Sequence, residues 1–307
     1  MSGHNETGKN EGVANSDEAP MGLARTSPAG ILAQRVGRRM ELVQRLLQQG
    51  PATNTLPAES LGLSAGTSRT FGRIGCVWCP PGQFVMGSPE DEEGRWVDEI
   101  QHSVTLTRGF WMAWQPTTQA EYTAVMGINP SRFKGIDQYG NDREICSVET
   151  VSWNEAVEYC QQLTSKHRAQ GILSCCQKWR LPTESEWEYA ARAGGSSIIY
   201  LPEDLNLCDE DFWYPGAPGI NPGDGPNGWG LGEMIRNVSE WCSDWYAAYS
   251  PEPLTDPKGP ITGKFRVLRG DYWSSVEEKT FRFAFRNGET PDTRKDHIGF
   301  RPVLSQD

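Results

Sequence analysis

Three segments of the chain carry the signal of a helix start, a Ser or Thr that is followed three residues later by Glu. In such a capping box the hydroxyl accepts a hydrogen bond from an amide of the first turn, while the Glu accepts from the amide of the cap residue. Apolar residues then recur at helical spacing, as Ala156, Tyr159, Cys160 and Leu163 do after the second signal. The sequence therefore predicts three helices. Their signals are Thr118 with Glu121, Ser152 with Glu155 and Thr183 with Glu186.

Strand-like segments are short, and most of them follow Gly194, where the chain becomes rich in Pro, Gly, Asn and Trp. CVWCPPGQFVMGS (residues 76–88) indicates one earlier strand, entered through a Pro pair. FRVLRG (265–270) and KTFRFAFR (279–286) indicate two late ones. Helices early in the chain and short strands between long loops late in the chain are typical of an α+β domain with little regular structure.

Residues 1–70 differ from the rest of the chain in composition. Residues 1–30 are rich in Gly, Asn, Ser, Glu and Pro, and they carry too few apolar side chains to form a core. Residues 31–49 read ILAQRVGRRMELVQRLLQQ, where apolar residues at helical spacing alternate with arginines and predict a short basic amphipathic helix. Residues 50–70 read as a linker. We predict a flexible N-terminal extension over 1–70 and a folded domain over 71–307. The helix in the extension is docked on the domain, idle in a tail, or a partner-binding or membrane-surface helix.

Charge and hydropathy exclude several classes of function. The net charge of −11 argues against a general nucleic-acid binder, because phosphate binding needs a basic surface. The acidic run within residues 90–99 is typical of a solvated loop, since like charges repel and stay exposed. No run of about 18 apolar residues is present to span a membrane, and no apolar core follows a basic start as in a signal peptide. The default expectation is a cytoplasmic protein.

The chain has eight cysteines, and Cys76 and Cys79 have the spacing of half a zinc site. A complete site needs a second ligand pair. Cys175 and Cys176 are adjacent rather than spaced, and the four histidines are scattered. We therefore expect ordinary thiols and packing residues rather than structural zinc.

Three longer stretches together resemble the formylglycine-generating enzyme (sulfatase-modifying factor) family. They are RLPTESEWEYAAR (residues 180–192), NGWGLGEMIRNVSEW (227–241), and the C-terminal segment that begins RVLRG and ends GFRPV (266–303). FVMGS and VSWNEAVEYC precede them in the order that the family has. The resemblance covers roughly residues 80–303. It implies an α+β domain with a C-type lectin-like fold of the formylglycine-generating enzyme type and much irregular structure.

The residues that carry the oxidase chemistry of that family are missing. The oxidases use two cysteines, five residues apart, just after a Gly-Gly-Ser-aromatic turn, to bind Cu(I), a soft ion that prefers sulfur. Here the turn reads GDYW (270–273), and counting in that frame places Ser275 and Thr280 at the two cysteine positions. No cysteine follows Cys242. We therefore expect no copper and no formylglycine generation by that mechanism.

Two other branches of the superfamily differ in their chemistry. Sulfur-transferring iron oxygenases hold iron on three histidines with a partner helical domain, which the scattered histidines here do not match. The variable proteins of diversity-generating retroelements are non-catalytic, and they display a binding surface between RVLRG and GFR. Most candidate residues in that segment can be reached from an Asn codon by changing only adenines, but Glu289 and Lys295 cannot.

The resemblance to variable proteins implies a ligand-binding surface in the C-terminal segment. Its candidate residues are Asp271, Tyr272, Trp273, Ser274, Ser275, Phe283, Phe285, Gly288, Thr290, Thr293 and His297. Aromatic side chains give a large, rigid contact area, which suits recognition. An alternative holds for the three phenylalanines at 281, 283 and 285, which alternate with period two and would form the inward face of a strand.

A structural Ca²⁺ is also implied by the resemblance, in the loop GLGEMIRNVSEW (230–241). Ca²⁺ takes six to eight hard oxygen ligands. The side-chain ligands would be Glu233 and Glu240, and the carbonyls would come from Arg236 and Val238. Glu233 replaces the usual Asp or Asn, and Arg236 replaces a Gly. The alternative is an ion pair of Arg236 with Glu233 or Glu240 that braces the loop without metal.

These observations predict a non-catalytic protein that binds a protein or other macromolecular ligand, and no nucleic acid, through its C-terminal segment. The alternative is a formylglycine-generating oxidase that acts on sulfatase cysteines. A third hypothesis is an accessory subunit that docks through the helix at 31–49.

Overall fold

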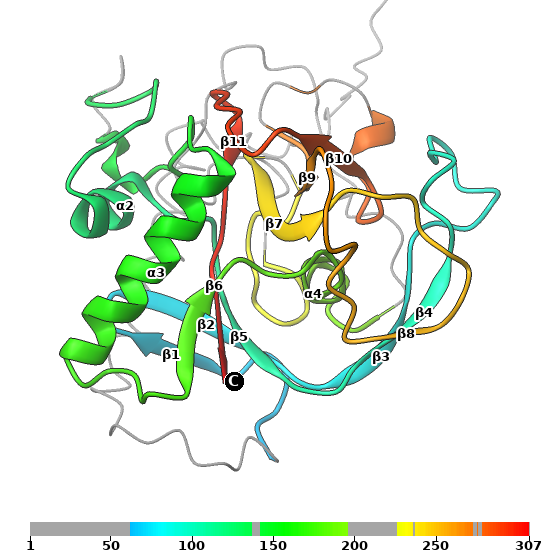
Figure 1. The fold of residues 1–307 in the computed structure, drawn as a ribbon, viewed down its shortest axis with the longest axis horizontal. Helices are drawn as coiled ribbons and strands as arrows, with labels where there is room; N and C mark the ends of the chain where they lie inside the picture. Colours follow the sequence, from blue (N-terminus) through cyan, green and yellow to red (C-terminus); the bar gives the residue numbers. More distant parts are fainter. Residues whose placement is uncertain are drawn as a thin grey trace, which may run out of the picture.

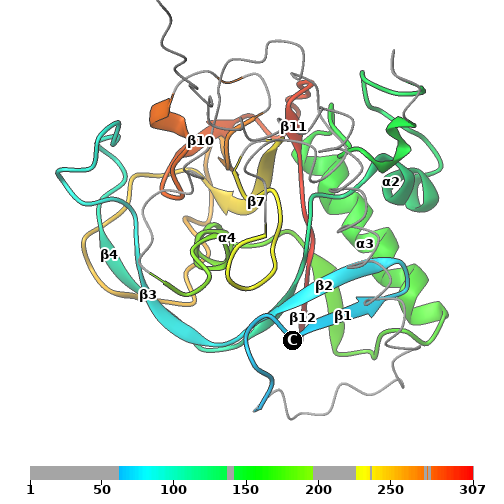
Figure 2. The same ribbon diagram turned by 180° about the vertical axis from the view of Figure 1, so that it is seen from behind.

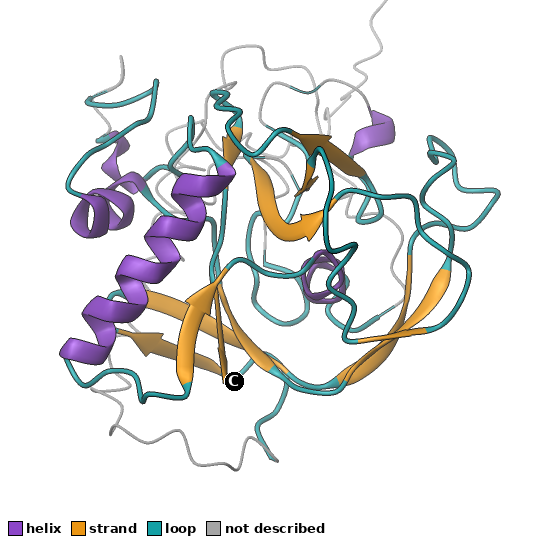
Figure 3. Ribbon diagram, viewed as in Figure 1, coloured by secondary structure: helices purple, strands orange, loops and turns teal. Residues whose placement is uncertain are grey.

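The computed structural model describes most of the chain after residue 61. The described residues are 62–136, 142–195, 226–235, 237–272, 275 and 278–306. The helix predicted at 31–49 and residues 1–61 of the predicted extension lie outside them, as do Arg236, Trp273 and Ser274. Residues 68–70, at the end of the extension predicted over 1–70, belong to strand β1 (Ser68–Phe71). Three sheets and three α-helices are described, joined by long loops (Figures 1 and 3). The predicted α+β class with little regular structure is confirmed.

A five-stranded antiparallel sheet has the strand order β1-β2-β5-β12-β6. Its strands are β1 (Ser68–Phe71), β2 (Ile74–Cys79), β5 (Phe110–Ala113), β12 (Val303–Gln306) and β6 (Gln177–Arg180). The C-terminal strand β12 pairs with both β5 and β6. The end of the chain therefore lies inside this sheet, between two strands that are far apart in the sequence (Figure 1).

Two smaller sheets complete the domain. The first has the order β10-β9-β7-β11 and consists of β10 (Arg286–Glu289), β9 (Arg266–Arg269), β7 (Ser239–Trp245) and β11 (Ile298–Gly299). The second has the order β3-β4-β8 and consists of β3 (Gly82–Met86), β4 (His102–Leu106) and β8 (Leu254–Thr255). Each contains one short parallel pairing, β11 with β7 and β8 with β4.

The three α-helices begin where the sequence predicted. They are α2 (Gln119–Met126), α3 (Trp153–Ala169) and α4 (Glu184–Ala191), and each has both reciprocal hydrogen bonds of a capping box. α2 ends at Gly127 with a φ of 76°, a left-handed conformation that glycine adopts without steric cost. Two short 3₁₀ turns, η1 (Arg143–Ile145) and η3 (Glu278–Thr280), lie in the loops.

The strand predicted within 76–88, entered through the Pro pair, is β3 (Gly82–Met86), and residues 76–79 before the pair belong to β2 in a different sheet. A second strand prediction was wrong. KTFRFAFR is not a strand, since η3 and a turn precede β10. Phe281 and Phe283 are nevertheless buried, at 1% and 3% exposure, whereas Phe285 is half-buried. FRVLRG contains β9 as predicted.

Two hydrophobic clusters form the core, and the CxxC pair is divided between them. Cys76 lies in the cluster beside α3, and Cys79 lies in the cluster beside α4. Side chains three positions apart on a strand point to opposite faces of the sheet, so the thiols of Cys76 and Cys79 do not converge. Burial raises the pKa of both thiols. Within the described ranges, no group of three or more His, Cys, Asp and Glu side chains could hold a metal ion.

Candidate functional site at the C-terminal turn

The turn after β9 is held by close packing around Gly270. Its φ is 74°, in the left-handed region that side chains other than hydrogen disfavour. A Cβ at this position would lie 3.0 Å from the carbonyl oxygen of Met234 and 3.2 Å from the ring of Trp187. The turn therefore requires glycine, and it directs the chain from β9 into the segment with the predicted ligand-binding residues.

The two positions that the sequence assigned to the missing cysteines are adjacent in space. Ser275 Oγ lies 3.0 Å from Thr280 Oγ1, and both side chains are buried. The Thr280 hydroxyl donates a hydrogen bond to Asp271 Oδ2. The hydrogen bond between the two hydroxyls is therefore donated by Ser275. The result is a hydrogen-bonded chain from Ser275 through Thr280 to Asp271, which we call the hydroxyl relay.

The hydroxyl relay is internally satisfied. Asp271, at 1% exposure, also accepts from the backbone amide of Tyr272 at 2.8 Å. The amide of Ser275 donates to the carbonyl of Tyr272 at 3.0 Å. Hydroxyls in this arrangement are weak ligands for a soft ion such as Cu(I), which needs thiolates. The relay therefore stabilises the turn and provides no copper site of the kind that a cysteine pair forms.

The predicted ligand-binding residues divide into buried and partly exposed groups. Asp271, Ser275 and Phe283 are buried, at 1%, 8% and 3% exposure, so the expectation that their side chains face a ligand is wrong for this conformation. The half-buried residues are Tyr272, Phe285, Gly288, Thr290, Thr293 and His297.

Two members of the partly exposed group, Tyr272 and His297, are in direct contact. Their rings stack with centroids 4.1 Å apart and an interplanar angle of 24°, although 25 positions separate them in the sequence. Burial lowers the pKa of His297, which favours the neutral ring. The sequence predicted both residues, and the structure brings their rings together in one aromatic stack.

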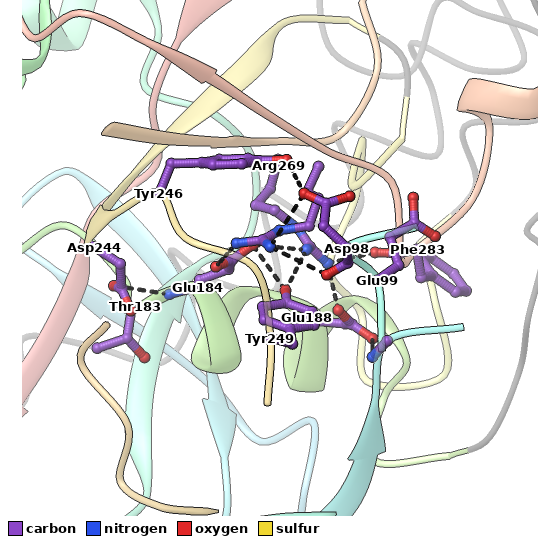
Figure 4. Close-up of polar contacts among 12 residues, drawn as sticks. Asp98, Glu99, Thr183, Glu184, Glu188, Asp244, Tyr246, Tyr249, Arg269 and Phe283 are labelled. Carbon is purple, nitrogen blue, oxygen red and sulfur yellow. Dashed lines mark hydrogen bonds and ion pairs between the residues drawn. The ribbon is translucent and has the colours of Figure 1, made fainter. Parts of the chain in front are cut away.

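A network of buried ion pairs lies beneath the turn (Figure 4). Arg269 of β9 is 0% exposed and donates to Glu188 at 2.5 Å and to Glu184 at 3.1 Å, both on α4. Arg286 of β10 binds the carboxylate of Glu184 through two hydrogen bonds of 2.7 and 2.8 Å. The Tyr249 hydroxyl donates to Glu184 at 2.8 Å. This network, the arginine framework, ties β9 and β10 to α4.

Another buried arginine joins the acidic run to the C-terminal segment. Arg282, at 2% exposure, donates to both oxygens of Glu99 at 2.7 and 2.8 Å and to Glu92 at 2.7 Å. It also donates to the carbonyl of Gly94 at 2.9 Å. The prediction of a solvated acidic loop was therefore wrong for part of the run, because Arg282 compensates Glu92 and Glu99 in the interior.

The residues predicted to bind Ca²⁺ do not fit that ion in this arrangement. Both oxygens of Glu240 accept from Arg301 at 2.7 Å, and Glu240 Oε2 also accepts from the indole of Trp187 at 2.8 Å. The carboxylate of Glu233 accepts a hydrogen bond from the side-chain amide of Asn237 at 2.6 Å. A guanidinium already occupies the position beside Glu240 that a cation would need. The loop is braced by an ion pair, as in the alternative, but the partner is Arg301; Arg236 lies outside the described residues.

Sequence reasoning missed the carboxylates of the arginine framework. Glu184 and Glu188 are 5% and 0% exposed. Their spacing of four residues on α4 places both on one helix face, which was the available signal. Charged side chains on a short helix usually face solvent, so burial became evident only when β9 and β10 supplied arginines.

Comparison with known proteins agrees with this architecture. Residues 66–306 match the family model of the sulfatase-modifying factor enzyme 1-like domain. The formylglycine-generating enzyme of Streptomyces coelicolor is 36% identical over 176 residues, which cover 50% of this chain and 51% of that protein. The Mus musculus enzyme is 33% identical over 198 residues, covering 58% of this chain and 49% of that protein. The chain thus spans about half the length of these curated relatives.

Solved structures show the same fold. Treponema denticola variable protein 1 superposes with a TM-score of 0.62 at 25% identity, over 77% of this chain and 98% of that one. PvdO from Pseudomonas aeruginosa superposes with a TM-score of 0.63 at 23% identity, over 80% of this chain and 100% of that one. None of the helices that the structure describes has the length and apolar character needed to cross a bilayer. The chain has a C-type lectin-like α+β fold and belongs to the sulfatase-modifying factor enzyme 1-like family.

Proposed function

We propose that this protein is a non-catalytic binding protein, which contacts a macromolecular ligand through its C-terminal segment around Tyr272 and His297. The observation that carries the proposal is the hydroxyl relay. Ser275 and Thr280 lie side by side at the two positions where the oxidases that this chain resembles have cysteines. Their hydroxyls hydrogen-bond to each other, and that of Thr280 hydrogen-bonds to Asp271.

The chemistry of the relay argues against the oxidase alternative. Serine and threonine hydroxyls remain protonated at neutral pH, whereas a Cu(I) site needs deprotonated, polarisable sulfur ligands. Burial of the relay also keeps both hydroxyls away from solvent and from a substrate. The remaining cysteines offer no substitute, because every cysteine of the chain precedes Ser275 and the described ones form no metal-binding group.

The partly exposed residues support recognition of a macromolecule. Tyr272 and His297 present stacked rings, and a rigid aromatic surface provides contact area at a low cost in conformational entropy. Thr290 and Thr293, which hydrogen-bond to each other at 2.8 Å, add polar groups on the same segment. The similarity to a variable protein from Treponema denticola agrees with a binding role, while the similarity to formylglycine-generating enzymes keeps the alternative open to test.

The first test separates binding from catalysis. The purified protein is supplied with Cu(I), O₂ and a peptide that carries a sulfatase-type cysteine motif, and peptide oxidation is followed by mass spectrometry. We expect no oxidation and no stoichiometric copper. The double variant Ser275→Cys with Thr280→Cys is the matched control, and we expect it to retain Cu(I). Oxidation of the peptide by the unmodified chain would establish the oxidase alternative.

The second test addresses the binding surface. Proteins captured from a lysate of the source organism are compared between the unmodified chain and the double variant Tyr272→Ser with His297→Ser. A partner that is retained by the first and lost with the second supports the proposal. Arg294→Gln, which alters an exposed residue in the same segment, is the control for non-specific charge effects. Equal capture by all three proteins would place the binding surface elsewhere.

A further inference from the structure

Two adjacent cysteines lie in the turn between α3 and β6. Of the seven cysteines that the structure describes, Cys175 and Cys176 are exposed and the other five are buried. Cys208 lies outside the described residues. Figures 1 and 2 show this turn at the end of α3 that is away from η3 and β10. The pair is therefore separate from the C-terminal turn, and the ligand that it fits can be argued independently.

The two sulfur atoms are close enough to share one ligand atom. Cys175 Sγ lies 3.6 Å from Cys176 Sγ. An atom bonded to two thiolates at about 2.3 Å needs sulfurs roughly 4.6 Å apart if its geometry is linear, but roughly 3.3–3.8 Å apart if its geometry is pyramidal or tetrahedral. The observed separation therefore matches a bent bridge and is too short for a linear one.

Hydrogen bonds hold the backbone beneath the pair. The amide of Gln177 donates to the carbonyl of Ser174 at 3.2 Å, which closes a β-turn around the two cysteines. The side-chain carbonyl of Gln177 accepts from the amide and the hydroxyl of Ser174 at 2.9 and 3.1 Å. Arg168 of α3 donates to the carbonyl of Cys175 at 2.8 Å and to that of Gln177 at 2.7 Å. The thiols are thus presented by a hydrogen-bonded turn, which lowers the entropy cost of binding through both of them.

The pair differs from the other described cysteines in its access to solvent. Burial raises the pKa of several other thiols and so disfavours the thiolate, which is the form that binds soft ions. These thiols are those of Cys76, Cys79, Cys160 and Cys242. Because Cys175 and Cys176 are exposed, a solute can reach both sulfurs without opening the fold.

The pair lacks the further ligands of a metal site. Within the residues that the structure describes, no group of three or more His, Cys, Asp and Glu side chains could hold a metal ion. A structural zinc site takes four protein ligands, so two thiols are a poor match for zinc. A centre that brings its own third substituent needs only the two thiols. Trivalent arsenic with one carbon substituent meets this requirement, and as a soft centre it prefers sulfur to oxygen.

We propose that Cys175 and Cys176 form a binding site for trivalent arsenicals with a single organic substituent, R–As(OH)₂. Two As–S bonds form as two As–O bonds break, and each thiol proton leaves with an arsenic-bound hydroxyl as water. Arsenic stays trivalent and neither sulfur is oxidised, so the step needs no oxidant or reductant. The product has arsenic bonded to its own carbon and to the two sulfurs, in the pyramidal geometry that the sulfur separation fits.

The test uses the full chain and phenylarsine oxide, which is hydrated to the R–As(OH)₂ form in water. The reduced protein is mixed with this arsenical in millimolar glutathione, a monothiol that removes arsenic from single cysteines. Intact-mass spectrometry measures the adduct, and thiol titration of the folded chain measures the thiols that it consumes. We expect one arsenical per chain, the loss of two titratable thiols, and release by 2,3-dimercaptopropanol, a dithiol that competes as a chelator.

Single substitutions separate the pair from the other cysteines. Cys175→Ser and Cys176→Ser should each lower the affinity for phenylarsine oxide by roughly a hundredfold or more, because one thiol remains and chelation is lost. Cys208→Ser is the control for the cysteine outside the described residues, and we expect it to bind like the unmodified chain. Since the substituted side chains are exposed, both variants of the pair should stay folded, which circular dichroism checks.

Three results would overturn the proposal. The first is that no adduct of the unmodified chain survives glutathione. The second is that the adduct persists in both Cys175→Ser and Cys176→Ser. The third is that Zn²⁺, supplied in place of the arsenical, is retained as firmly by the unmodified chain and lost from these two variants, since further ligands would then complete a metal site.

Discussion

Two clusters of buried hydroxyls in this domain differ in one respect, the presence of partners. At the C-terminal turn, Ser275 and Thr280 are bonded to each other and to Asp271. On α2 and α3, Tyr122 and Tyr159 stack on each other and are also buried, but no described group bonds either hydroxyl. A satisfied cluster stabilises the folded chain by itself, whereas a buried hydroxyl without a partner costs free energy. The difference indicates that the first cluster stabilises the fold, whereas the hydroxyl of Tyr159 lowers its stability.

The largest expected effect comes from breaking the arginine framework beneath the first cluster. Arg269→Met should destabilise the domain by about 3–5 kcal/mol, because Glu184 and Glu188 would remain buried without compensation. Arg294→Met is the control: Arg294 pairs with Glu155 at the surface, and its side chain is 49% exposed, so we expect about 0–1 kcal/mol. Urea unfolding measures both. Equal losses for the two variants would contradict a special role for the framework.

The next effect concerns pH and the carboxylate at the start of α4. Burial, together with the neighbouring Glu184, raises the pKa of Asp244 to about 7 from 3.8. The folded chain then binds a proton between these values that the unfolded chain has lost, so stability falls as pH rises from about 4 to about 7. The loss is at most on the order of 4 kcal/mol.

Asp244→Asn should flatten this pH dependence and make the variant relatively more stable at alkaline pH. Unfolding free energies at mildly acidic and mildly alkaline pH, compared between the variant and the unmodified chain, measure the effect. Parallel profiles for the two proteins would show that Asp244 is ionised in the folded state across the range.

Removal of one hydroxyl from each cluster should have opposite consequences. Thr280→Val takes a donor from buried Asp271, so we expect a destabilisation of about 1–3 kcal/mol. Tyr159→Phe removes a hydroxyl that has no described partner, and we expect stability to be unchanged or raised by up to about 1 kcal/mol. Thermal and urea unfolding of both variants without added ligand measure this contrast. The comparison fails if both substitutions destabilise alike.

The smallest expected effect is that of calcium. Because Arg301 already compensates Glu240, addition of millimolar Ca²⁺ should leave the melting temperature unchanged, and a chelator should have no effect. Differential scanning calorimetry with and without Ca²⁺ tests this. A clear upward shift would restore the calcium prediction for the loop at 230–241 and would require Arg301 to move.

Local sequence signals predicted local structure well. The capping boxes at Thr118, Ser152 and Thr183 each begin a helix, because their hydrogen bonds involve only residues within one turn. β9 lies within FRVLRG, which the sequence indicated as a strand. The early strands β4 and β5 were not predicted, and the pairings of β12 with β5 and β6 could not be, since they join residues that are far apart in the chain.

The sequence by itself determined the family resemblance, the three helix starts and the loss of the paired cysteines, because each of these depends on residue identity or short spacing. Only the tertiary structure decided which polar groups are satisfied. Asp271 was predicted to face a ligand, yet it is buried and accepts a hydrogen bond from Thr280. Tyr159 was predicted on the apolar face of its helix, and it is buried there with a hydroxyl that no described group bonds. Hydrogen-bond partners are supplied by distant segments, so their presence or absence is a property of the folded chain.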